Sequence, residues 1–298
     1  MHDGILRVLL LRHGRGVQHG RVKEVDMSLI TITHTIGCDA LAIARRVADG
    51  LTVEIYDDSR LREEALRMGL HTEQLKGFRE KAPDWFEHLL SEKPEMYLNL
   101  MESVIYEAAR CGQGVIIGHG SQMLLHDFNC AMHVLVTSHE ESRIHRLMHE
   151  MKLSRGASQK LIRKSDNEKR RFFRYAFHKD WDDPSLYDLY VNPDKVGSDK
   201  AAQLIMEMAR SPELESCSMY ALDALGRMSQ TKRIEATLME MDLRHSALRV
   251  EMPEKGVAHI TGVLYNHEDK GRIPAVVGRI PGVEKVQLDV TLVPAGYD

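Results

Sequence analysis

Short β-branched strands alternate with amphipathic helices over residues 29–210, and this alternation constrains the fold more than any other feature of the sequence. Leu29 to Thr33 has the composition of a buried parallel strand. After a turn at Gly37, residues 40–51 place small and aliphatic side chains on one helical face. Further strands are expected at 53–56, 114–118, 133–136 and 187–192, and helical stretches at 59–112 (interrupted at Pro83 and Pro94), 140–177 and 199–210. This order predicts an α/β domain, a parallel sheet with helices on both faces, over residues 27–210.

The pattern changes after residues 211–226, which we expect to be a linker. A helix is expected near 230–243, followed by alternating strands at 248–252 and 257–263. Residues 266–277 look helical with an interruption at Pro274, and a turn at 280–283 precedes a last alternating strand at 286–292. The sequence therefore predicts a small C-terminal α+β domain over 227–298, in the order α-β-β-α-β.

Composition excludes several classes of protein. A chain of 298 residues is long for one core and suggests about two domains. Its formal charge of −4 argues against a protein that binds nucleic acid along its whole surface. Residues 1–26 lack an apolar period and are expected to be a flexible extension before Met27. The longest early apolar run, 8–11, is too short for a signal peptide or a membrane span.

The four cysteines are scattered, with no CxxC pair and no Cys/His spacing typical of a metal site. They are Cys38, Cys111, Cys130 and Cys217. We therefore expect no disulfide framework, no structural zinc or other bound metal of that type, and a reducing cytoplasm.

Three segments could carry chemistry. The strand, turn and helix over 30–48 could cradle phosphate with backbone N–H groups, although the pattern G-x-x-x-x-G-K-[ST] is absent and every α/β domain has such junctions. Gly118-His119-Gly120 could let a ligand approach the backbone, or could be a simple tight turn. Residues 160–174 carry seven basic against two acidic side chains, a local charge of +5. That segment could be a lid over polyphosphate, a solvated helix face or an RNA-binding patch, and the acidity of the whole chain counts against the last.

Taken together, residues 29–210 resemble the cytidylate kinase-like branch of the nucleoside monophosphate kinases. The residues that match are Ile30-Thr31-Ile32-Thr33 leading to Gly37, Ile43-Ala44, Tyr56-Asp57, Gly114 to Gly120, Arg143, Asp166 with Arg170 and Arg171, Trp181-Asp182, and Tyr187-Asp188-Leu189 with Asn192. The resemblance implies a P-loop kinase fold that transfers the γ-phosphoryl group of Mg-ATP to a monophosphate such as CMP.

On that resemblance, each group of site residues has an implied role. The ATP phosphates would lie on Thr33, His34, Gly37, Cys38, Asp39, Ala40 and Leu41. Asp57, Asp58, His119 and Arg143 would bind the acceptor nucleotide. Arg170, Arg171 and Asp166 would serve the transfer step from the lid, with Mg²⁺ accompanying ATP.

The phosphate loop departs from the family pattern S-R-x-x-G-S-G-G-R. Two glycines are replaced by Asp39 and Ala40, and the terminal cation is replaced by Leu41. Where the family has an arginine after the central strand, this chain has His119, and histidine is mostly neutral near pH 7 when unperturbed. Because the loss of one transition-state donor costs roughly 10²–10³ in rate, we expect weak or absent catalysis on an intact fold.

The C-terminal segment resembles a BON domain. The matching residues are Val257 to Val263 and Ile280 to Val286, followed by the alternating Leu288, Val290 and Leu292. That resemblance implies binding of phospholipid or a small ligand, and a dimerisation or packing module is an equally open interpretation. Three functions therefore remain: a nucleoside monophosphate kinase, a nucleotide-sensing pseudokinase coupled to the C-terminal domain, and an adaptor that directs the chain to a membrane or protein partner.

Overall fold

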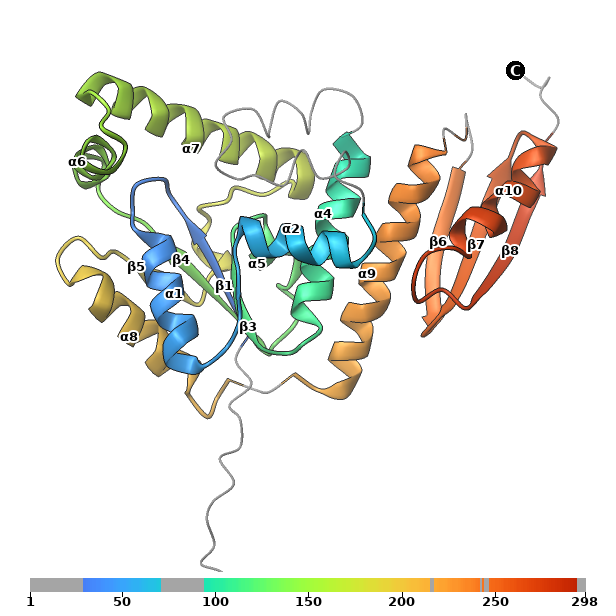
Figure 1. Ribbon diagram of the computed structural model, residues 1–298, viewed down its shortest axis with the longest axis horizontal. Helices are drawn as coiled ribbons and strands as arrows, with labels where there is room; N and C mark the ends of the chain where they lie inside the picture. The colour runs from blue at the N-terminus through green and yellow to red at the C-terminus, as the bar shows by residue number, and fades with distance from the viewer. Residues whose placement is uncertain (1–28, 71–93, 215–216, 242, 244–246, 294–298) are drawn as a thin grey trace, which may run out of the picture.

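A five-stranded parallel sheet forms the centre of the larger domain (Figure 1). The computed structural model describes residues 29–70, 94–214, 217–241, 243 and 247–293. The strands run in the order β2-β3-β1-β4-β5, and every neighbouring pair is parallel. Their bounds are β1 Leu29–His34, β2 Ile55–Tyr56, β3 Gly114–Ile117, β4 Ala131–Val136 and β5 Leu189–Val191. The predicted α/β fold class, a parallel sheet with helices on both faces, is confirmed.

Both faces of this sheet are covered by helices, and β1 is buried on each side. Ile30 and Ile32 pack against α1 (Ala40–Leu51) and α8 (Gly197–Ala209), whereas Leu29 faces the core formed with α4 (Pro94–Ala109). That second face also carries α2 (Asp58–Arg67) and the short α5 (Ser121–Leu124). The carboxyl ends of the strands therefore open toward loops that two layers of helices hold in place.

The charged helical stretch expected over 140–177 is two helices rather than one. α6 (Glu140–Met151) ends at Lys152, which adopts the left-handed conformation with φ of 55°. α7 (Arg155–Phe177) follows at an angle, so the pair projects from one end of the sheet (Figure 1). The side chain of Ser154 accepts a hydrogen bond from the Ala157 N–H and begins α7.

The C-terminal domain has the predicted order α-β-β-α-β. It consists of α9 (Met219–Glu240), β6 (Ala247–Glu254), β7 (Val257–Leu264), α10 (His267–Val277) and β8 (Lys285–Leu292). β6 is antiparallel to β7, and β8 is parallel to β7. Ile234 and Leu238 of α9 pack with Ile260 and Ile273 in a separate hydrophobic core.

Helix α9 belongs to both domains at once. Leu225 is buried in the core of the larger domain, and the Ser229 hydroxyl donates to the Ser103 carbonyl on α4 at 2.8 Å. Lys232 forms an ion pair with Glu102 of α4 at 3.0 Å. Burial raises the pKa of Glu102, and the Lys232 ammonium opposes that shift. The two domains therefore share one rigid helix rather than a loose tether.

Two expectations about the C-terminal half were wrong. The linker expected over 211–226 is partly helical, because Ser218 caps α9 by accepting from the Ala221 N–H at 3.1 Å. An apolar period did not reveal this first part of α9, because its large apolar residues Met219 and Tyr220 are exposed and do not mark the buried face. α10 is continuous through Pro274, which removes one backbone donor without ending the helix. The expectations for residues 1–26 and Pro83 lie outside the described residues.

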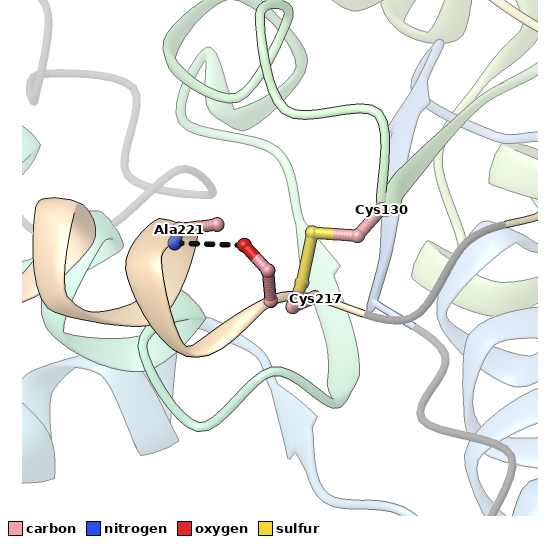
Figure 2. The surroundings of a disulfide bond; sticks show 4 residues. Cys130, Cys217 and Ala221 are labelled. Atoms are coloured by element: carbon pink, nitrogen blue, oxygen red, sulfur yellow. Dashed lines mark hydrogen bonds between the residues drawn. A yellow bond between two sulfur atoms is a disulfide. The ribbon is translucent and has the colours of Figure 1, made fainter.

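The expectation of no disulfide framework was also wrong. Cys130, just before β4, is bonded to Cys217, just before α9 (Figure 2), with 4.9 Å between the Cα atoms. The two residues are 87 positions apart, and sequence spacing gives no information about a contact that folding creates. Cys38 and Cys111 are free thiols. Within the described residues, no helix is long and apolar enough to cross a membrane.

We predict that Cys217→Ser destabilises the larger domain by up to about 4–5 kcal/mol, because a long loop is no longer closed in the unfolded chain. Guanidinium unfolding without reductant measures the loss. Cys111→Ser, at an exposed free thiol, is the matched control and should leave the midpoint within experimental error. Equal midpoints for the two variants would contradict this account.

Candidate functional site

The loop between β1 and α1 lies at the centre of the candidate site. Gly37 has φ of +79°, and a Cβ atom there would lie 3.0 Å from the Arg143 carbonyl oxygen of α6. A side chain at this position would therefore be strained and would collide with backbone. The fold requires glycine here because the first turn of α6 lies directly against the loop.

Three cations from the projecting helices hold the carbonyl oxygens of this loop. Arg143 Nε donates to the Ile36 carbonyl at 2.8 Å, Arg146 donates to the Gly37 carbonyl at 3.3 Å, and Lys169 donates to the His34 carbonyl. In a trans peptide the following N–H points the opposite way. The amides of Gly37 and Cys38 are therefore directed away from these cations.

The N-terminus of α1 adds a second set of donors. The N-cap residue, Asp39, makes no side-chain hydrogen bond to this end of the helix. The first amides of the helix and its positive dipole end therefore lie beside the amides of Gly37 and Cys38, an arrangement that favours an anionic group.

The side chains of the loop are less suited to an anionic group than its backbone. Asp39 adopts φ of 64° at the N-cap position of α1, and its carboxylate accepts a hydrogen bond from the Ser198 hydroxyl of α8. Ala40 is buried, and Leu41 packs against the core on the side of α1 and α8. The loop therefore offers a carboxylate and an alkyl group where the family pattern has glycine and a cation.

Arg143 joins the loop to both projecting helices. Its guanidinium donates two hydrogen bonds to Asp166 of α7, at 2.7 and 2.9 Å, in addition to the bond to Ile36. The Arg143 side chain is 7% exposed and that of Asp166 is 26% exposed. This bidentate pair is partly shielded from water, which makes it stronger than a surface ion pair.

Cys38 is a buried thiol inside the same loop, and its Sγ donates to the Val136 carbonyl at 3.4 Å. Burial raises the pKa of this thiol, but the hydrogen bond and charge of His34 and the hydrogen bond of Thr35 more than offset burial. The pKa therefore lies below its ordinary value. His34 lies at the end of β1 and Thr33 is buried one residue before it.

The expected acceptor side is built from α2 and the turn after β3. Asp57 caps α2 by accepting from the Arg60 N–H at 3.1 Å. The next residue, Asp58, lies 3.1 Å from Nε2 of the buried His119. His119 has φ of 54°, and at the adjacent Gly120 a Cβ atom would lie 2.7 Å from the Phe177 ring of α7. The turn is therefore packed tightly beneath α7.

The structure brings some of the predicted site residues together and keeps others apart. Arg143, Asp166 and the loop residues come together, and so do Asp58 and His119. Arg170 donates to Asn167 on its own helix, and Arg171 is exposed. Arg146 and Ser198 were missed because no local pattern marks a residue whose partner lies on another element. Lys169 belongs to the basic run of 160–174, but its contacts with His34 and over the Trp181 ring, at 5.4 Å, are tertiary.

The matches to known proteins agree with this geometry. The family model of the cytidylate kinase-like family matches residues 29–195, which include the five strands of the sheet and the β1–α1 loop. The chain belongs to the cytidylate kinase-like family. Its fold and family indicate a nucleotide or nucleoside kinase-like function at the coarse level.

Solved structures with a similar chain path are distant in sequence. An uncharacterized protein from Eubacterium ventriosum is 17% identical, with 62% of this chain and 99% of that chain covered and a TM-score of 0.47. Shikimate kinase from Acinetobacter baumannii, in complex with shikimate, is 14% identical, covering 63% and 96%, with a TM-score of 0.38. Shikimate kinase from Bacteroides thetaiotaomicron is 14% identical, covering 62% and 99%, with a TM-score of 0.40. No curated protein matches the chain.

Members of the cytidylate kinase-like family generally use ATP with Mg²⁺. Among the described residues, no group of three or more His, Cys, Asp or Glu side chains could hold a metal ion. Mg²⁺ in phosphoryl-transfer sites is bound largely by substrate phosphates and water, with one or two carboxylates. The loop and the α1 N-terminus are the parts of this chain that would hold the phosphates.

We predict that Arg143→Ala destabilises the larger domain by about 2–4 kcal/mol, because Asp166 and the Ile36 carbonyl lose their shared donor. Urea unfolding of the full chain measures the change. Arg170→Ala, whose side chain donates to Asn167 of its own helix, should shift stability by no more than about 0.5 kcal/mol. If the two variants unfold at the same midpoint, Arg143 does not hold the loop.

Proposed function

We propose that this protein is a nucleotide-sensing pseudokinase: it binds a nucleotide at the β1–α1 loop, transfers the phosphoryl group slowly or not at all, and couples binding to the C-terminal domain. The observation that carries this proposal is the carboxylate of Asp39 at the N-terminus of α1, held by Ser198. A negative charge at this position repels phosphate in the ground state and opposes the charge that develops during transfer.

Binding is supported by the backbone of the loop. Its amides and the uncapped α1 terminus supply donors that do not depend on side-chain identity. The cations of α6 and α7 hold these amides in place through the carbonyl oxygens. Loss of the family's terminal cation at Leu41 therefore weakens the site without removing it.

Coupling to the C-terminal domain is supported by a continuous series of packed helices. Asp58 begins α2, α2 packs on α4, and α4 packs along α9, which extends into the second core. A change at the acceptor side therefore has a rigid route to β6 and β7. Under this proposal α9 is the element that both domains position.

A second candidate is phosphoryl transfer from Mg-ATP to a nucleoside monophosphate such as CMP. It is favoured by the position of α7, which places Lys169 on the loop and carries Arg170 and Arg171 in the next positions. Those residues and Asp166 would neutralise charge during transfer, and Asp57, Asp58, His119 and Arg143 would bind the acceptor. The phospholipid or protein partner expected of the BON-like domain, and a cytoplasmic location, stay predictions.

We predict that Asp39→Gly with Leu41→Arg raises the affinity for Mg-ATP about 10- to 100-fold, because a repulsive carboxylate is removed and a phosphate ligand is added. Isothermal titration of the full-length wild-type and variant chains measures the change. Wild-type protein should bind Mg-ATP weakly.

The control is Asp49→Lys at the other end of α1, which changes the net charge by the same two units. It should leave the affinity nearly unchanged, since surface charges at that distance are screened by salt. Equal affinities of wild-type and double-variant proteins, or no binding by either, would contradict the proposed site.

A further inference from the structure

The outer strands of the two sheets are not equally protected against pairing with another chain. β2 has two residues and β5 has three, and very short outer strands are poor templates for pairing. β6 contains Pro253, and its register with β7 shifts between Glu251 and Glu254. A proline and a bulge are both devices that block an edge.

β8 has none of these protections. It is eight residues long, contains no proline and stays in unbroken register with β7 from Lys285 to Leu292. In the described part of the chain it is the last strand of its sheet, with no strand on its outer side. A long, regular outer strand is a template for β-pairing.

The backbone of β8 shows which of its groups face outward. The backbone N–H of Lys285 donates to the Gly256 carbonyl, and the backbone N–H of Val293 donates to the Leu264 carbonyl. The backbone groups of odd-numbered residues therefore bond to β7. Because successive residues of a strand direct their backbone groups to opposite sides, the N–H and C=O groups of the even-numbered residues face the outer edge. These residues are Val286, Leu288, Val290 and Leu292.

The same four aliphatic residues form the outer margin of the C-terminal core. Each packs against the core formed by α9, α10 and β7, yet each is only half-buried. A further strand beside β8 would extend the apolar face of the sheet and cover these side chains. The outer edge of β8 therefore presents both backbone hydrogen-bonding groups and partly exposed apolar side chains.

We propose that the β8 edge is a self-association surface, where β8 pairs antiparallel with β8 of a second copy of this chain. In the register centred on Leu288, Leu288 faces the partner's Leu288 and Val286 faces the partner's Val290. These pairs have outward backbone groups and exchange hydrogen bonds. The two three-stranded sheets become one six-stranded sheet about a two-fold axis.

Charge on the solvent face argues against one neighbouring register, and the length of the paired segment argues against the other. Lys285, Gln287, Asp289 and Thr291 are exposed and alternate with the apolar residues, and Asp289 also forms an ion pair with His259 of β7. With Leu288 on the axis, Gln287 lies opposite the partner's Asp289 and Lys285 lies one diagonal position away from it, within reach of a long side chain. Sliding the strands by two positions in one direction places Asp289 opposite itself, which is repulsive. Sliding them the other way places Lys285 opposite the partner's Asp289 but shortens the paired segment.

Sedimentation equilibrium of the full chain tests the proposal. The wild-type protein should have about twice the 34.0 kDa mass of one chain. Val290→Pro removes an outward N–H that does not bond to β7, so this variant should sediment as a single chain. Asp289→Lys should weaken association about tenfold, because the new lysine lies diagonal to the partner's Lys285. Adding Lys285→Asp to it should restore wild-type association.

The matched control is Glu251→Lys on β6, which makes the same change of charge as Asp289→Lys on the same solvent face. It removes the ion pair of Glu251 with Arg249, just as Asp289→Lys removes the ion pair of Asp289 with His259. It should associate like wild-type protein. A wild-type monomer at the highest soluble concentration would overturn the proposal. The proposal would also be overturned if the Val290→Pro and Asp289→Lys variants self-associated as tightly as the Glu251→Lys variant. If Val290→Pro fails to fold by circular dichroism, the charge reversal and its restoration decide.

Discussion

The contact of Arg143 with both Asp166 and the Ile36 carbonyl is the interaction on which the site depends. One partly shielded guanidinium ties α6, α7 and the β1–α1 loop into a single unit. Gly37 makes that contact possible, because only glycine accepts both its positive φ and the nearby Arg143 backbone. The backbone of the loop is fixed because cations of α6 and α7 hold its carbonyl oxygens.

The loop side chains differ from the family pattern, whereas the loop backbone is held by cations of α6 and α7. Asp39 and Leu41 stand where that pattern has a glycine and a cation, and Ser198 stabilises the carboxylate from α8. Binding through backbone amides tolerates such differences, whereas transition-state stabilisation needs preorganised positive charge at the transferred group. Under the proposed function, this domain therefore binds a nucleotide without efficient transfer. The shared helix α9 provides a structural link to the second domain.

The sequence predicted elements with a clear period and missed contacts that folding creates. Leu29 to His34 and the residues after Gly37 were recognisable, because buried strands and amphipathic helices have distinct spacing. The start of α9 was taken for a linker, since its exposed apolar residues Met219 and Tyr220 do not mark the buried face. The bond between Cys130 and Cys217, and the Ser198 contact with Asp39, join residues far apart in the chain. No local pattern specifies such pairs.

ADP release by the full chain, with saturating Mg-ATP and CMP, tests most directly whether this domain binds ATP without transferring its γ-phosphoryl group. The reference is a variant with Lys169, Arg170 and Arg171 replaced by alanine, which removes the cations that phosphoryl transfer would need. Our account predicts that wild-type protein, shown by titration to have bound ATP, releases ADP no faster than this reference. Release well above the reference would contradict the account and establish phosphoryl transfer despite Asp39.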